Sequence, residues 1–424
     1  MLDINLIRQN PEKVKKGIAS KNVDPKLVDD FLVVDEKWRN QKQLIDEKRS
    51  QQKNFGKDNL EEAKKLKIEI KDLEVRVNEL EKEREVILYQ LPNIPTDDVP
   101  IGKDASENVV IKQVGEKPKF DFVPQDYLTV AEKLDLIDIE RASKVSGSRF
   151  GYIKGGLALL EFALIQFVLS ALVDQEKLKE IIKANNLNIS SRPFIPIVPP
   201  VFIKPDVFQK MARLEPKEER YYIPSDDLYL VGSAEHTLGS MHLDETFKED
   251  QLPLRYIGFS TSFRREAGSY GQDTKGILRV HQFDKLEMES FTVPEDSIKE
   301  QDFLVAIESY IVEALKLPFQ VVKICTGDMG GPDTRQIDIE TWMPGQNKYR
   351  ETHTSDLMTD YQARRLNTRV KRQDGKIEFV HMNDATALAV GRILIAIIEN
   401  YQTKDGTIKV PEALQKYIGI DEIK

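Results

Sequence analysis

The sequence predicts an α+β fold, with an antiparallel sheet flanked by helices and an antiparallel helical hairpin in the N-terminal part. Three observations lead to this prediction. Residues 1–107 are dominated by Lys, Glu, Asp, Gln and Arg, with apolar residues spaced as on helices. From residue 108, short β-branched and aromatic runs alternate with turns and a few strong helices. A Pro-rich stretch at 92–100 ends the last helix of the first part. The predicted domains are therefore 1–107 and 108–424.

The hairpin is expected over about residues 28–90, as a coiled-coil arm. Its second helix carries apolar residues in a three-then-four alternation, at Leu66, Ile70, Leu73, Val77, Leu80 and Ile87. Its first helix repeats Phe31, Trp38 and Ile45 every seventh residue, and Val34 joins that stripe. Gly56 and its Asx neighbours up to Asn59 can reverse the chain between the helices. On this pattern alone, a plain interaction coiled coil is the favoured interpretation.

Composition limits the kind of protein and its compartment. The chain has 424 residues, 40% of them apolar, and one cysteine, Cys325, which excludes an intrachain disulfide and argues against zinc. No secretory pattern opens the sequence, so a cytoplasmic location is expected. The apolar stretch 155–173 is interrupted by Glu161 and Gln166, which predicts a buried helix and no membrane span. A net charge of -9 argues against indiscriminate nucleic-acid binding but permits a local basic face.

The segment 263–283 is predicted to form a strand, a long loop and a returning strand. Arg264 ends the first strand, Gly268 and Gly271 lie in the loop, and Arg279 and Phe283 are placed on the return. Guanidinium groups pair with phosphate oxygens and an aromatic ring stacks on a purine, so the set suits a nucleotide. The glycines by themselves would equally suit a simple hairpin.

A second arginine motif lies near the C-terminus. Residues 386–394 are predicted to be an apolar helical run that contains Arg392. A buried, unpaired arginine is costly, so Arg392 requires an acid or a bound phosphate beside it.

Together these residues resemble bacterial-type seryl-tRNA synthetases over nearly the whole chain. The resemblance is carried by the hairpin and by motifs at 1–4, 92–95, 136–141, 146–150, 198–200, 263–283 and 386–392, the last three being class II motifs in order. It implies the class II antiparallel sheet, a homodimer, and activation of L-serine with ATP and Mg²⁺ followed by transfer to the 3′ end of tRNA(Ser). Whether tRNA(Sec) is also a substrate stays open.

The resemblance also implies roles in ATP binding. Arg264 matches the ligand of the α-phosphate, which also reaches the serine carboxylate, and Glu266 matches the acid beside the adenine. Phe283 should stack on the adenine, and Arg279 and Arg392 should hold the outer phosphates. The residues implied to act in catalysis are Arg264, Glu266 and Arg392.

Metal and serine ligands follow from the same resemblance. Glu351 and Thr354 match the acid and hydroxyl that bind Mg²⁺ through oxygen. The groups implied to bind serine are Ser233, Glu235, Arg264, Glu287 and Thr386. Such a polar pocket penalises alanine, because its buried groups would lose their partner.

Three places depart from the family pattern. Asp384 stands where the third motif has Asn, so it could help to bind the serine ammonium or repel ATP, and it is left out of the site. Residues 355–357 replace a Cys-Ser-Asn run after the metal hydroxyl, and residues 233–237 vary the serine loop.

Four other classes of protein compete with this interpretation. A noncatalytic paralogue usually loses the phosphate arginines, which this chain keeps. A ligase that charges a carrier protein lacks the arm and binds zinc through a ligand set that includes Cys. A threonine or proline synthetase lacks the hairpin. A coiled-coil scaffold does not explain the arginines.

The arm is expected to read the long variable arm of tRNA by shape. Its candidate contacts are Lys42, Lys48, Arg49, Lys53, Lys57, Lys64 and Lys71, each of which fits a solvated helix face as well.

Overall fold

The computed structural model describes residues 1–53, 55, 60–267 and 276–424. The chain divides into two compact units, Met1–Pro95 and Thr96–Lys424. The functional boundary after residue 107 stays a prediction.

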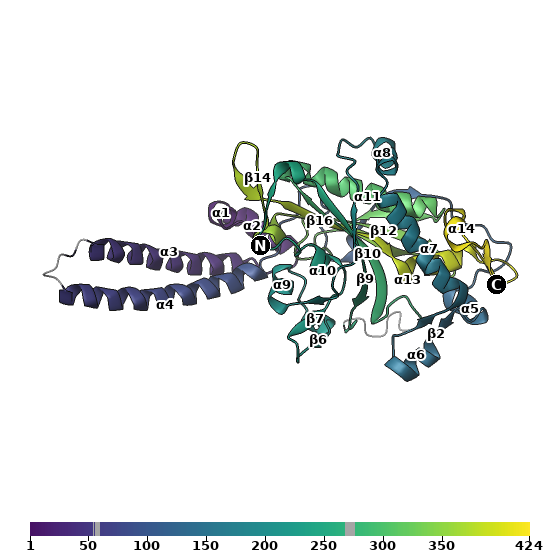
Figure 1. Cartoon of the computed structure of the whole chain (residues 1–424), viewed down its shortest axis with the longest axis horizontal. Helices are drawn as coiled ribbons and strands as arrows, with labels where there is room; N and C mark the ends of the chain where they lie inside the picture. Colours follow the sequence, from purple (N-terminus) through teal and green to yellow (C-terminus); the bar gives the residue numbers. More distant parts are fainter. Residues whose placement is uncertain (54, 56–59, 268–275) are drawn as a thin grey trace. The chain divides into compact units, whose positions relative to one another are not determined.

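The first unit is helical. It consists of α1 Ile4–Gln9, α2 Pro11–Ser20, α3 Lys26–Lys53 and α4 Leu60–Gln90. Helices α3 and α4 lie side by side (Figure 1), and Ile45 of α3 packs against Leu66 and Ile70 of α4. The predicted seam of the coiled coil is thereby confirmed. The predicted reversal at residues 56–59 lies outside the described residues.

Ion pairs fix the antiparallel register of the hairpin. Asp35 of α3 is buried and accepts hydrogen bonds from Arg8 of α1 at 2.7 Å and from Arg84 of α4 at 3.1 Å. Burial opposes ionisation, but the arginines hold the pKa of Asp35 below its usual value. Further along, Lys48 pairs with Glu69 at 2.6 Å. Asp35, earlier on α3, pairs with Arg84, late on α4, whereas Lys48, later on α3, pairs with Glu69, early on α4. The two helices are therefore antiparallel.

The second unit is built around an eight-stranded sheet in the order β1-β11-β12-β13-β16-β10-β9-β4. Its strands are β1 Val109–Val114, β4 Ile195–Ile197, β9 Leu254–Phe263, β10 Gln282–Thr292, β11 Phe319–Lys323, β12 Arg335–Met343, β13 Lys348–Thr359 and β16 His381–Ala389. All neighbours are antiparallel except β4 and β9. The predicted antiparallel sheet is confirmed.

Smaller elements surround this sheet. The short strands are β2 Ile137–Asp138, β3 Tyr152–Ile153, β5 Phe202–Ile203, β6 Tyr222–Ile223, β7 Leu228–Leu230, β8 Thr246–Lys248, β14 Arg369–Lys371, β15 Ile377–Phe379, β17 Ile408–Lys409 and β18 Glu422–Ile423. The α-helices are α5 Tyr127–Lys133, α6 Ile139–Ser146, α7 Gly155–Leu172, α8 Gln175–Ala184, α9 Pro205–Lys210, α10 Glu235–Leu238, α11 Ser297–Ala314, α12 Tyr361–Leu366, α13 Val390–Tyr401 and α14 Glu412–Ile418. The 3-10 helices are η2 Ala105–Glu107, η3 Lys217–Glu219, η4 Glu249–Gln251 and η5 Pro294–Asp296.

The two faces of the sheet differ in polarity because side chains alternate along each strand. On β10, Leu286 and Met288 belong to the main hydrophobic core, which also contains residues of α7, α11 and α13. Lys285 and Glu287 point to the other face. One face is therefore covered by helices (Figure 1), and the other carries polar groups.

Helix α7 is long and apolar enough to span a membrane by length and composition alone. One side of it is buried in the core, through residues such as Leu160 and Leu164. The other side exposes Leu159 and Phe162, at 55% and 68%. The predicted core helix is present, and it has a second apolar face that this chain leaves uncovered.

Candidate active site

A cavity partly open to solvent lies on the polar face of the sheet. Its walls come from the end of β9, the turn before β10, and from β10, β13, β16 and α13. The predicted site residues that line it are Arg264, Glu266, Arg279, Phe283, Glu351, Thr354, Thr386 and Arg392. Segments more than a hundred residues apart thus meet at one place.

Arg264 is held from several sides. It follows the last residue of β9, and its backbone N–H donates to the carbonyl of His281 at 3.1 Å. Its Nε donates to the Gly232 carbonyl at 3.0 Å, and its guanidinium lies 5.4 Å from the centre of the Phe283 ring. One edge of the guanidinium is therefore used for positioning, and the group lines the cavity.

Arg279 and Glu266 meet at the cavity mouth, with Nη1 3.5 Å from a carboxylate oxygen. The prediction that Arg279 lies on the returning strand is wrong, because β10 begins at Gln282 and Arg279 precedes it in a turn. Gly268 and Gly271 of the predicted loop lie outside the described residues.

Arg392 lies in the first turn of α13 and pairs with Glu351. Its Nη1 donates to the carboxylate at 2.8 Å and to the backbone carbonyl of the same residue at 3.0 Å. The predicted acid partner is confirmed, but the predicted burial is wrong, since the Arg392 side chain is 27% exposed. The Glu351 side chain is 48% exposed, and Arg392 and Arg264 hold its pKa below the usual value.

The predicted helical run 386–394 is also corrected. Thr386 to Ala389 belong to β16, paired with β10, and the helix begins at Val390. The run is apolar because the strand is buried between two neighbouring strands. Over so few residues, the pattern of hydrophobicity does not distinguish a buried strand from a buried helix.

A β-bulge brings Glu351 and Thr354 to the same cavity. Residues three apart on a regular strand face opposite sides. Here the register with β12 shifts between His353 and Glu351, so that Thr352 is the extra residue and both side chains line the cavity. Oxygen donors of this kind suit Mg²⁺, which takes few protein ligands beside phosphate and water. The residues present therefore fit the metal.

Buried polar groups form a pocket beside this cavity. Ser233 donates to Glu287 at 3.3 Å, and Thr386 lies 3.5 Å from the same carboxylate oxygen. Lys285 donates to Ser233 at 3.1 Å and pairs with Glu287 at 2.5 Å. Burial raises the pKa of Glu287 to about 7, although Lys285 opposes that rise. The other carboxylate oxygen of Glu287 has no hydrogen-bond partner among the described residues.

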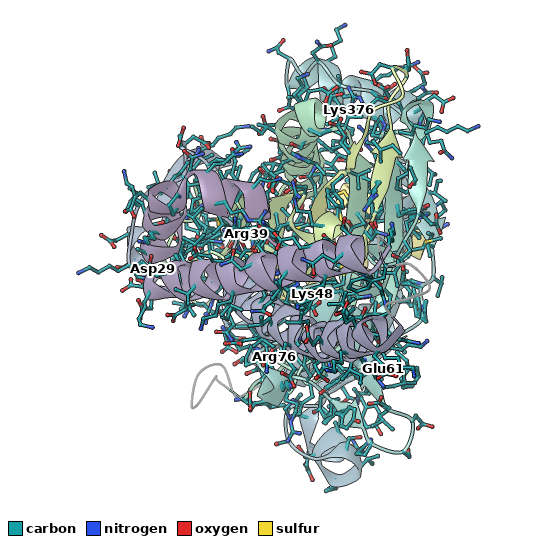
Figure 2. All side chains as sticks on the ribbon, turned by 90° about the vertical axis from the view of Figure 1, so that its left-hand side faces the viewer. Asp29, Arg39, Lys48, Glu61, Arg76 and Lys376 are labelled. Carbon is teal, nitrogen blue, oxygen red and sulfur yellow. The ribbon has the colours of Figure 1, made fainter. Side chains whose placement is uncertain are left out.

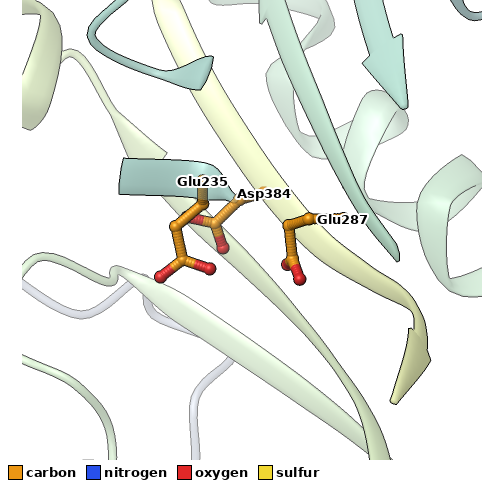
Figure 3. Close-up of side chains that lie close together, drawn as sticks. All are labelled: Glu235, Glu287 and Asp384. Carbon is orange, nitrogen blue, oxygen red and sulfur yellow. The ribbon is translucent and has the colours of Figure 1, made fainter. Parts of the chain in front are cut away.

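Glu235, on α10, completes the acidic side of this pocket. Figure 3 shows it beside Glu287 and Asp384, and each of the three offers a carboxylate oxygen within 4.8 Å of the others. Burial opposes ionisation of Glu235, but Lys285 and other cations hold its pKa well below the usual value. Burial and the charge of Glu235 raise the pKa of Asp384. The arrangement is suited to a cationic group.

Some residues of the site were not predicted from the sequence. Lys285 could have been found, because it alternates with Phe283 and Glu287 on one face of β10. Arg213 and Arg220 lie in irregular chain before β6, where no periodicity marks them. Both line an adjoining cavity with Arg264, and burial and Arg264 lower the pKa of Arg220 to about 10. Such crowding of cations favours an anion in the cavity.

A cavity rich in arginines on an antiparallel sheet defines the class of protein. Residues 220–401 match the family model of the tRNA synthetase class II core domain (G, H, P, S and T), so the chain has a class II synthetase core. Residues 1–95 match the seryl-tRNA synthetase N-terminal domain. The chain belongs to the seryl-tRNA synthetase family.

Relatives and solved structures agree with this assignment. The serine–tRNA ligases of Dictyoglomus turgidum and Fervidobacterium nodosum are 42% and 36% identical, over 100% of this chain and 99% of each relative. The crystal structure of seryl-tRNA synthetase from Pyrococcus horikoshii complexed with ATP is 35% identical, with a TM-score of 0.90 and coverage of 100% and 99%. The cytoplasmic serine–tRNA ligase of Naegleria fowleri in complex with AMP is 32% identical, with a TM-score of 0.87 and the same coverage.

Proposed function

We propose that this chain activates L-serine with ATP and transfers it to the 3′ end of tRNA(Ser). The observation that carries the proposal is the convergence of Arg264, Arg279 and Arg392 on one cavity beside the buried pocket of Ser233 and Glu287. The cavity can hold a polyanion, and the pocket can hold a small molecule with an ammonium and a hydroxyl group.

Adenylate formation needs positioning more than acid–base chemistry. The serine carboxylate attacks the α-phosphorus in line, and pyrophosphate leaves with its electron pair. Arg264 neutralises both anions as they approach, and Arg279 and Arg392 hold the outer phosphates. Phe283 stacks on the adenine and Glu266 accepts from its amino group. These roles agree with where the side chains lie.

Glu351 and Thr354 would hold Mg²⁺ at the phosphates. When bound, the metal neutralises phosphate charge. Glu351 is paired with Arg392 in the free protein. Arg392 is therefore expected to turn from this carboxylate toward phosphate when ATP enters, which frees carboxylate oxygen for the metal.

Serine is expected to bind with its ammonium toward Glu235 and Glu287 and its hydroxyl toward Ser233 and Thr386. All four groups are buried, so a substrate without the hydroxyl leaves polar atoms unpaired. Discrimination of about 10⁴-fold against alanine is reachable by this route.

The hairpin is proposed as the reader of tRNA, within an N-terminal domain of residues 1–107 ahead of a catalytic domain of residues 108–424. Charged side chains cover both helices, among them Lys48 on α3 and Arg76 on α4 (Figure 2). Of the candidate contacts, Lys48, Arg49 and Lys64 are engaged in ion pairs with Glu69, Glu74 and Glu61, and Lys57 lies outside the described residues. We expect tRNA phosphates to compete for these cations, since exposed ion pairs contribute little.

A homodimer working in the cytoplasm is proposed as the functional form. The exposed side of α7 is an apolar surface that carries Leu159 and Phe162. A surface of this kind marks an interface. A twofold partner would bury it against the same surface of a second copy.

Exchange of radioactive pyrophosphate into ATP tests the function directly. Serine should support exchange, whereas threonine, alanine and proline should not, and total tRNA should then accept serine. Exchange with another amino acid in preference to serine, or serine activation without tRNA charging, would contradict the proposal.

A further inference from the structure

Arg213 gathers four acids around one guanidinium. It lies between α9 and η3, with its side chain 15% exposed. Its Nη2 is 3.2 Å from Asp356, 3.3 Å from Asp384 and 3.4 Å from Asp333, and its Nε is 3.5 Å from Glu235. The acids come from β13, β16, the turn before β12, and α10. We name these five residues the Arg213 cluster.

The sheet register shows why a cation is needed at this position. Glu289 on β10 lies opposite Asp384 on β16, and Asp384 lies opposite Asp356 on β13, so three buried acids form one row across three strands. Burial and the neighbouring acids raise the pKa of all three carboxyl groups, and Arg213 opposes that rise. Among the described residues, Arg213 is the cation that forms an ion pair with both Asp384 and Asp356.

The Arg213 cluster adjoins the serine pocket through Glu235. This acid lies 3.8 Å from Lys285, which in turn pairs with Glu287. Asp384 brings a carboxylate oxygen within 4.8 Å of those of Glu235 and Glu287 (Figure 3). The position of Glu235 therefore depends on how Arg213 and Asp384 are paired.

A second link joins Arg213 to the phosphate side. Its backbone carbonyl accepts from Nε and Nη2 of Arg220, at 3.0 and 2.7 Å. Arg220 and Arg264 line the same cavity. This link runs through the backbone of Arg213, so a side-chain substitution leaves it in place.

We propose that Arg213 is a positioning residue for serine: by pairing with Asp333, Asp356 and Asp384, it holds Glu235 where the substrate ammonium binds. Asp384 acts as a partner of Arg213, at 3.3 Å, and not as a ligand of ATP. The inference rests on the proposed function and adds to it a residue that acts through Glu235. It also accounts for the departure at residue 384, since an acid there has its own cation.

Four variants test this assignment in serine-dependent pyrophosphate exchange. Arg213→Met should raise the KM for serine about tenfold or more, because the acids left without Arg213 displace Glu235. The KM for ATP should change less than about twofold, because the ATP ligands are not displaced. Asp384→Asn should raise the KM for serine by less than Arg213→Met does, because Arg213 keeps three acids. In the double variant, the KM for serine should be at least about threefold lower than in Arg213→Met. This recovery is the coupling expected of two residues that form a pair. Arg213→Lys keeps the charge without the fork and should fall between wild type and Arg213→Met.

Arg335→Met is the matched control. Arg335 is equally shielded, with its side chain 11% exposed, and pairs with Asp302 at 2.8 Å and Asp98 at 3.3 Å, apart from the pocket. This variant should lower the melting temperature but leave the serine KM within about twofold. If Arg213→Met does not fold, Arg213→Lys with and without Asp384→Asn completes the same cycle.

Two results would overturn the inference: equal changes in the KM for serine and for ATP in Arg213→Met, or a double variant no better than the single one. Absence of serine-dependent exchange in the wild type would instead refute the proposed function. In that case, the melting temperatures of the wild type, Arg213→Met, Asp384→Asn and the double variant still report the coupling between Arg213 and Asp384.

Discussion

Replacing Arg264 with alanine should remove most of the activating power of the site. Its Nε is bonded to the Gly232 carbonyl at 3.0 Å, and the side chain lines both adjoining cavities, so the remaining donors can reach substrate. Loss of a donor aimed at developing charge costs about 2.7–4 kcal/mol, or a factor of about 10²–10³ in rate. The lost bond to Gly232 adds about 1 kcal/mol of positioning. We therefore expect serine-dependent exchange to fall by at least about a hundredfold.

The neighbouring arginine supplies the control for that experiment. Arg265 is exposed, and its guanidinium lies 5.7 Å from the ring of Tyr221. Arg265→Ala should therefore stay within about threefold of wild type, as surface substitutions usually do. Arg264→Lys should fall between the two, because it keeps the charge and loses the fork. Exchange by Arg264→Ala within a few-fold of wild type would refute the role of Arg264.

Four further predictions concern the arm, the pocket and the interface. Deleting residues 31–89 with a short linker should preserve pyrophosphate exchange and abolish tRNA charging, and a parallel loss of both would make the arm structural. Burial raises the pKa of Glu287 to about 7, so its carboxylate is largely neutral at pH 6 and ionised at pH 8. Serine affinity should then rise by about five- to tenfold between those values, measured as KM, while an affinity that falls with rising pH would contradict the assignment. Phe283→Ala should raise the KM for ATP about tenfold and leave the KM for serine nearly unchanged, since stacking on a base contributes about 1–3 kcal/mol. Phe162→Asp should convert the dimer to a monomer in light scattering, whereas an unchanged mass would exclude α7 from the interface.

The arm and the sheet could be predicted because their patterns are local. The seventh-residue spacing of Trp38 and Ile45, and the three-then-four spacing that begins at Leu66 and Ile70, can be read within short stretches of the sequence. These residues form the seam in the structure. The start of α13 could not be placed, because the last residues of the buried strand before it, from Thr386 to Ala389, are mostly apolar like the helix itself. Patterns of hydrophobicity distinguish such segments only over longer runs.

Site residues that belong to a family motif could be predicted from the sequence. Residues that join the site only through tertiary contacts could not. Arg264 and Arg392 were identified by resemblance to the family motifs, and the structure brings both to one cavity. The bulge that turns Glu351 toward that cavity depends on the register between β13 and β12. This register cannot be predicted from the sequence. Arg213 was missed for a similar reason. Its four acid partners are more than twenty residues away along the chain, so no local spacing marks it.

A crystal structure of the protein with ATP and Mg²⁺ would show whether the three arginines bind the triphosphate. It should show the guanidinium groups of Arg264, Arg279 and Arg392 on the triphosphate, the Phe283 ring on the adenine, and Arg392 turned away from the carboxylate of Glu351. A nucleotide bound elsewhere, or the same arginines still directed at protein atoms with ATP present, would contradict the central claim.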